Sequence, residues 1–288
     1  MSPRPSRRCA AALAGLAALL ALRTAAAAPA PSPGPASPVA APIEISGATR
    51  VEYDDRSGQL HAEGAPVVVT RGRTELRAPR VRYDGTARTI SASGGAALSD
   101  PELVMRAQTV EYRLADETVR AAGEVRMTTR REDAATALEA PVIEGSLRTR
   151  RFVATGGVRV ARGEWSAEGR RLDYDDRGRT AVLTGEPVAR HRDATLRAER
   201  ITFLLDQEVA RAEGGVEVRR GTLVGYAPRA EVFGRDNRAV LAGGARVDRG
   251  ADRVVAEVIE IDLEASRVTA RGASRVVVNP SPTPTRAP

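Results

Sequence analysis

The sequence predicts an all-β protein built from repeats. Apolar and polar residues alternate with a period of two, for example at Val158 and Val160. This alternation is typical of strands with one face on a core and the other in solvent. A second observation is a glycine that recurs about every 29 residues, which marks a repeat architecture. A third is that no stretch beyond the N-terminal segment has helical periodicity.

The repeat is clearest between Leu76 and Gly94, where a strand, an Asp-Gly turn and a second strand follow one another. We call the place of Tyr83 in this repeat the aromatic position. It is filled in turn by Tyr53, Tyr83, Tyr112, Gly145, Tyr174, Phe203, Val232 and Ile261. The closing glycines are Gly64, Gly94, Gly123, Gly156, Gly185, Gly214, Gly243 and Gly272. About eight repeats with two strands each predict roughly sixteen strands, and each repeat must bury its apolar face against its neighbours.

The chain divides into four segments by composition. Residues 1–28 combine an arginine-bearing start, an apolar run from Ala10 to Leu22 and a small-residue end, which predicts a cleavable signal peptide. A retained anchor is the alternative. Residues 29–42 form an Ala/Pro-rich linker, and 280–288 are expected to be a disordered tail. The repeats occupy residues 43–279.

Each repeat contains one slip in the alternation. Leu76 and Ala78 face inward, and so do Val81 and Tyr83, so two adjacent residues between them must face outward. Such a slip predicts a bulge that bends the strand. Outward positions carry opposite charges, which we expect to form solvated cross-strand pairs. These pairs are Arg50 with Glu52, Arg171 with Asp173, and Arg229 with Glu231.

The charges exclude a nucleic-acid binder. The chain has no lysine, and four of its 44 arginines lie in the predicted signal peptide, so the formal charge falls from +7 to about +3 when that segment is removed. The remaining charges are interspersed, whereas a nucleic-acid binder concentrates them on one face.

Side chains for catalysis or metal binding are scarce. The only cysteine is Cys9 in the predicted leader, and the chain has two histidines, so neither a disulfide nor a thiol or histidine metal site is expected. We interpret Asp175 and Asp176 as turn residues, because too few oxygens gather for calcium. No catalytic triad, phosphate loop or histidine metal motif occurs. The sequence therefore predicts a non-enzyme without a cofactor.

The interior positions are often small, as at Ala181, Ala210 and Ala239. One interpretation is close packing of facing sheets. The other is an apolar channel with room for lipid, which predicts a wider groove in repeats five to seven. The residues alone favour close packing.

The recurrent unit Leu-Arg-Ala-x-x-Val-x-Tyr-Asp…Ile-x-Ala-x-Gly, seen from Leu76 to Gly94 and echoed from Leu196 to Gly214, resembles the OstA-like (LptA) family. That family includes a periplasmic lipopolysaccharide-transport protein and the N-terminal domain of its outer-membrane partner. The resemblance covers about residues 43–278, although Gly145 and Val232 interrupt the aromatic series. It implies an elongated open β-jellyroll whose apolar interior holds the acyl chains of lipid A.

The resemblance also implies partners, location and a lipid groove. The partners would be lipopolysaccharide, an inner-membrane ABC transporter complex with its β-jellyroll subunit, the N-terminal domain of an outer-membrane translocon, and further copies of this chain joined end to end. The location would be the periplasm. The candidate lining residues of the groove are Val51, Tyr53, Val81, Tyr83, Val110, Tyr112, Leu172, Tyr174, Ile201 and Phe203.

Two other functions remain open from the residues. A structural or adhesive β-solenoid would have the same repeats around a closed core and no lipid ligand. A β-helical polysaccharide enzyme would need a cluster of carboxylates or basic groups on one face, and the outward charges show no such cluster.

Overall fold

The protein is all-β, as the sequence predicts. The computed structural model describes residues 41–130 and 135–279, so the predicted signal peptide, most of the linker and the tail lie outside the described residues. These described residues contain no helix, and hence none that could span a membrane. The strands are β1 (Ile43–Asp54), β2 (Gln59–Arg71), β3 (Thr74–Asp84), β4 (Thr89–Ser99), β5 (Leu103–Arg113), β6 (Thr118–Thr129), β7 (Ala137–Ser146), β8 (Arg151–Arg162), β9 (Trp165–Asp175), β10 (Thr180–Thr184), β11 (Val188–His191), β12 (Ala194–Arg197), β13 (Arg200–Leu204), β14 (Val209–Arg220), β15 (Leu223–Phe233), β16 (Arg238–Arg249), β17 (Asp252–Asp262), β18 (Arg267–Arg271) and β19 (Arg275–Val277).

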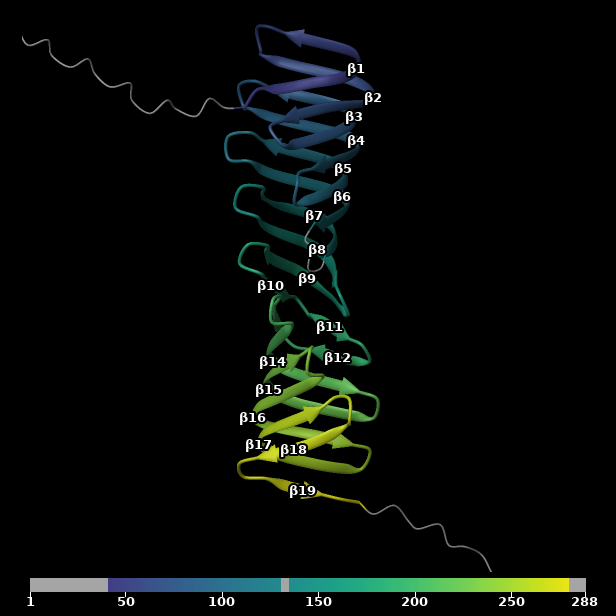
Figure 1. Ribbon diagram of the computed structural model, residues 1–288, viewed down its shortest axis with the longest axis vertical. Helices are drawn as coiled ribbons and strands as arrows, with labels where there is room; N and C mark the ends of the chain where they lie inside the picture. Colours follow the sequence, from purple (N-terminus) through teal and green to yellow (C-terminus); the bar gives the residue numbers. More distant parts are fainter. Residues whose placement is uncertain (1–40, 131–134, 280–288) are drawn as a thin grey trace, which may run out of the picture. The chain divides into compact units, whose positions relative to one another are not determined.

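The strands form one elongated antiparallel sheet in which each long strand pairs with the next one along the chain (Figure 1). The consecutive pairing continues from β1 to β9. Beyond that point, β9 pairs along its length with both β10 and β11, and β14 does the same with β12 and β13. At the C-terminal end β17 pairs with both β18 and β19.

Three of the roughly sixteen predicted strands are therefore split in two, which accounts for the nineteen strands among the described residues. The split between β10 and β11 has a direct cause. Gly185 and Glu186 both adopt positive φ angles, of 78° and 59°, and Pro187 has no N–H to donate to the ladder. Gly272, with a φ of 82°, similarly separates β18 from β19.

The predicted slip is confirmed as a shift in the register of the long strands. In β3 both Pro79 and Arg80 are exposed, and the register of β3 against β4 shifts between Arg77 and Arg80. Gly156 occupies the equivalent bulge of β8 with a φ of 94°, and a Cβ there would lie 3.0 Å from Pro141 Cγ on β7. These bulges bend the long strands partway along their length, so the sheet curls.

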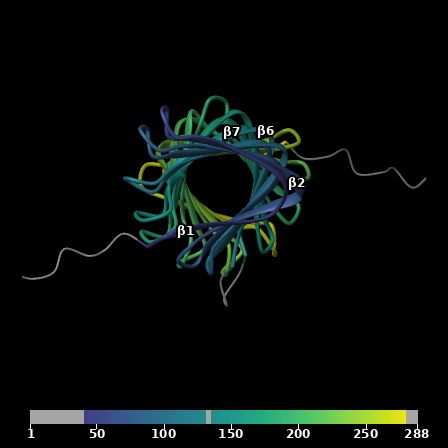
Figure 2. The same ribbon diagram turned by 90° about the horizontal axis from the view of Figure 1, so that it is seen from above.

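The curled sheet surrounds one continuous apolar core, whose buried members extend from Ala62 to Leu263. Viewed along the stack, the strands wrap around a common interior that these side chains occupy (Figure 2). We call the turns that follow the aromatic positions, such as 147–150 and 205–208, the aromatic edge. The turns between repeats, such as 100–102 and 163–164, form the opposite edge.

The two edges meet along a line that we call the seam. Arg71, on the opposite edge, donates to the carbonyl of Leu114 on the aromatic edge at 2.8 Å. Near the C-terminal end, Arg220 on the opposite edge likewise donates to the carbonyl of Glu264 on the aromatic edge, at 3.2 Å. Because these contacts join strands that are not neighbours in the sheet, they show that the sheet curls far enough for its edges to touch.

Candidate functional site: the apolar interior

The structure places the candidate lining residues in three different environments. Tyr83 is half-buried, while Val51 and Tyr53 are exposed by 54% and 61% because, among the described residues, β1 pairs with β2 alone. The other candidates are buried: Val81, Val110, Tyr112, Leu172, Tyr174, Ile201 and Phe203. All seven belong to the continuous core. The inward direction predicted for them agrees with this burial, and their contact with lipid stays a prediction.

A cavity of about 380 Å³ lies between the interior and the seam. Its apolar wall includes Trp165 on β9, Ala181 on β10 and Phe203 on β13. The indole of Trp165 packs against the His191 ring with 4.6 Å between ring centroids, and lies edge-on to Phe203 at 5.7 Å. Aromatic pairs at these separations contribute stability beyond the area that they bury.

His191 is a buried wall residue of this cavity. Burial lowers the pKa of the His191 imidazole, because removing the ring from water disfavours its charged form. The carboxylate of Glu164, 3.6 Å away, opposes this shift without reversing it. The ring therefore packs against Trp165 as a neutral side chain near pH 7.

The small interior residues are all buried, but they do not share the cavity. Ala181 lines it, whereas Ala210 and Ala239 are fully covered by the core. The cavity thus lies beside one of the three alanines for which a wider groove is predicted. A wider groove along repeats five to seven stays a prediction.

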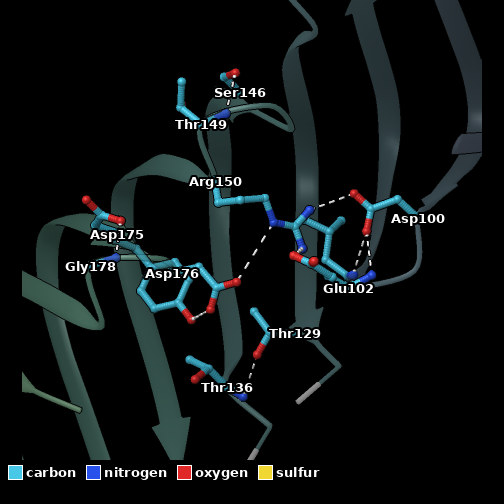
Figure 3. A network of polar contacts seen from close by, with 12 residues as sticks. Asp100, Glu102, Thr129, Thr136, Ser146, Thr149, Arg150, Asp175, Asp176 and Gly178 are labelled. Carbon is cyan, nitrogen blue, oxygen red and sulfur yellow. Dashed lines mark hydrogen bonds and ion pairs between the residues drawn. The ribbon is translucent and has the colours of Figure 1, made fainter. Parts of the chain in front are cut away.

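A buried polar network crosses the seam (Figure 3) and adjoins the cavity, because its member Tyr174 also lines the cavity wall. Arg150, in the turn after β7, reaches the carboxylate of Asp100 at 2.6 Å and that of Glu102 at 2.9 Å, both on the opposite edge. Its Nε lies 3.9 Å from the carboxylate of Asp176. Arg150, Asp100 and Asp176 are all buried, so the pairing offsets the cost of removing three charges from water.

Tyr174 joins the same network. Its hydroxyl donates to Asp176 Oδ1 at 2.8 Å. Burial raises the pKa of the Tyr174 phenol to about 12, and the charge of Asp176 acts in the same direction. Asp176, which the sequence placed in a turn as one of two adjacent aspartates, therefore accepts a hydrogen bond inside the network. The described residues contain no group of three or more His, Cys, Asp or Glu side chains arranged to hold a metal ion.

Sequence reasoning did not single out Arg150, Trp165 or His191. Trp165 is the chain's only tryptophan and lies directly opposite His191 in the β9–β11 ladder. A tryptophan that occurs once, at the end of a strand and paired with one of two histidines, is a sequence signal that could have identified this site. The Arg150 network had no such signal, because its partner Asp100 lies 50 residues away in the chain.

The outward charges pair in a way that corrects one prediction. Arg171 and Asp173 do form an ion pair, at 2.6 Å, and Arg50 pairs with Glu52, but both pairs lie within one strand. Glu231 pairs with Arg211 at 2.8 Å instead of Arg229, because Arg211 is the residue opposite it in the β14–β15 register. These exposed pairs are worth a few tenths of a kcal/mol each.

No protein-family model matches the chain, and no curated protein matches it either. The structure is similar to that of LptH from Pseudomonas aeruginosa, described as the LptA-homologous periplasmic component of the lipopolysaccharide transport device. The sequences are 20% identical, the TM-score is 0.38, and the match covers 40% of this chain and 95% of that one.

Proposed function

We propose that this protein is a periplasmic conduit for lipopolysaccharide that contributes to assembly of the outer membrane. The observation that carries the proposal is the unbroken apolar core, which extends through all the repeats and ends at strands with exposed apolar residues. An interior of this kind suits acyl chains, since each buried CH₂ contributes about 0.8 kcal/mol. The sugars and phosphates would stay outside the curled sheet.

The two ends of the sheet suit strand pairing with partners. Val51 and Tyr53 are exposed on β1, and Val276 and Val277 are exposed on β19. An exposed edge strand adds further strands through its free backbone groups. The proposed partners at these ends are the β-jellyroll subunit of an inner-membrane ABC transporter complex and the N-terminal domain of an outer-membrane translocon. The transporter would supply the energy, so this chain performs no catalysis in the proposal.

Photo-crosslinking of lipopolysaccharide tests the proposal. A photoreactive residue at Tyr83 or Ile201 faces the interior, and the matched control at Arg82 or Thr202 lies one residue along the same strand on the other face. We expect adducts from the inward positions alone. Adducts from neither inward position in the folded protein would refute the conduit.

A structural β-solenoid without a lipid ligand is the second candidate. The observation in its favour is the tight burial of the interior, where Leu172 and Ile201 have no exposed surface. A conduit must therefore part these side chains to admit an acyl chain. The same crosslinking experiment separates the two, because a solenoid gives no adduct at any position.

A further inference from the structure

The contacts that close the seam differ along its length. Arg71 bonds to the Leu114 carbonyl across it, and Arg150 bonds to Asp100 across it. Toward the C-terminal end, Arg220 bonds across it to Glu264. Between these contacts lies the cavity, where the turn at 163–164 faces the turn at 205–208.

At the cavity, one charged pair lies along each edge. On the opposite edge, Arg192 donates to Glu164 at 2.9 Å. On the aromatic edge, Arg235 donates to Glu208 at 3.3 Å and to the carbonyl of Asp206 at 2.9 Å. Since these pairs lie along the edges, they can persist when the two edges move apart.

The cavity combines an exposed rim with an apolar floor. Glu164, Asp206 and Glu208 at the rim are exposed, so the cavity opens to solvent. Ala181 and Phe203 at the floor are buried members of the continuous core. A volume near 380 Å³ falls within the range of about 300–1,000 Å³ that small-molecule sites occupy. The cavity thus connects solvent with the apolar interior from the side of the sheet.

One polar atom in the cavity wall lacks a partner. The indole Nε1 of Trp165 is buried and makes no hydrogen bond within the described residues. A buried donor of this kind is costly unless an acceptor is supplied. Gly234, on the aromatic edge, packs so closely that a Cβ there would lie 2.8 Å from Nε1.

From this geometry we infer that the cavity is a lateral binding site for a single fatty acyl chain, with Ala181 and Phe203 against the chain and the Trp165 indole N–H donating to an oxygen of its carboxylate or ester. The acyl chemistry rests on the proposed function. The place and size of the site rest on the cavity, the seam contacts and the indole.

Trp165 is the chain's only tryptophan, so its fluorescence reports on this site alone. The probe is dodecanoate, titrated below its micellar concentration into the full chain after removal of the signal peptide. We expect a saturable change in Trp165 emission. Dodecyltrimethylammonium, which has the same chain and no acceptor oxygen, should bind at least ten times more weakly.

Two variants locate the binding. Ala181→Leu places a larger side chain in the cavity, and Gly234→Ala moves the indole, so each should weaken dodecanoate at least ten-fold. Gly221→Asn is the matched control, since a Cβ at Gly221 meets nothing within 4 Å and asparagine tolerates its φ of 56°. Two variants are used so that one remains if the other fails to fold, as judged by circular dichroism.

Several outcomes would overturn the inference. These are no emission change with folded protein, a linear change without saturation, or equal weakening in Gly221→Asn. Equal affinity for the two probes would overturn the role of the indole N–H.

Lipopolysaccharide crosslinks at Tyr83 without a Trp165 response would remove the lateral site and leave the conduit intact. A Trp165 response without those crosslinks would support the lateral site and refute the conduit.

Discussion

Arg150 shows how strongly a single turn residue can couple distant parts of this sheet. Its guanidinium has 4% of its surface exposed and joins carboxylates from the turns after β4 and β9. Removing one partner from a buried ion pair leaves the other charges without compensation. The seam near β4 to β9 therefore depends on this residue more than on any exposed ion pair.

We expect Arg150→Met to lower the free energy of unfolding by about 3–5 kcal/mol, because Asp100 and Asp176 would remain buried without their cation. Urea denaturation followed by circular dichroism measures this change. Arg151→Met is the matched control. Arg151 is 75% exposed and pairs with Asp175 at 2.9 Å, so its loss should cost less than about 1 kcal/mol. Equal losses in the two variants would contradict the role given to the network.

His191 should make stability depend on pH. Its folded-state pKa lies below the ordinary value of 6.5, so the unfolded chain binds the proton more readily. The stability that the neutral imidazole contributes is fully present above the pKa of the unfolded state. It is lost as pH falls from about 6.5 toward the pKa of the folded state. Glu164 and Glu208 face the ring and oppose the loss, whereas the neighbouring Arg192 adds to it.

The measurement is the free energy of unfolding between pH 7.5 and 5.5 for the wild type and for His191→Gln. The wild type should lose more stability than the variant over this interval. Parallel curves would show that the imidazole remains as easily protonated in the folded protein as in the unfolded chain.

At the scale of the strand, the bulge glycines determine where the sheet turns. Gly156 has a φ of 94°, a conformation that other residues rarely adopt. A Cβ there would approach Pro141 Cγ at 3.0 Å, and the proline on β7 is itself held by the sheet. The bend thus needs glycine for both its backbone angle and its space.

Gly156→Ala should destabilise the protein by about 1–3 kcal/mol, through backbone strain and the contact with Pro141. Thermal unfolding gives the comparison. Gly72→Asn serves as the control, because Gly72 has a φ of 59°, meets nothing within 4 Å, and asparagine tolerates this region. A larger loss at Gly72 than at Gly156 would mean that the bulge does not require glycine.

The strands and their bends could be predicted from sequence because both are local patterns. The slip between Ala78 and Val81 is visible in a few residues, and the register shift follows it. Seam contacts are different, since they depend on how far the sheet curls. Arg150 and Asp100 lie 50 residues apart and meet only after curling, and the cavity beside Trp165 arises from the same long-range geometry.

For the whole molecule, the exposed ends are the feature that predicts association. Tyr53 on β1 is exposed by 61%, and among the described residues β1 pairs with β2 alone, so pairing with the C-terminal end of another copy would cover Tyr53. Association in the wild type should therefore increase with protein concentration, and sedimentation velocity over a wide range measures it.

Tyr53→Lys should shift the protein toward monomer, because lysine on an edge strand disfavours pairing. Ser91→Lys introduces the same charge change at an exposed position on the internal strand β4 and should leave association unchanged. A wild type that remains monomeric at every concentration would argue against end-to-end assembly.

The most direct test of the conduit is the mobility of a spin label inside the sheet when lipopolysaccharide is added. The chain's only cysteine, Cys9, lies in the predicted signal peptide, so Tyr83→Cys and Arg82→Cys give single labels on opposite faces of β3 in the mature chain. We predict that lipopolysaccharide slows the label at position 83 and leaves that at position 82 unchanged. No change at 83, or an equal change at both, would contradict an interior that holds acyl chains.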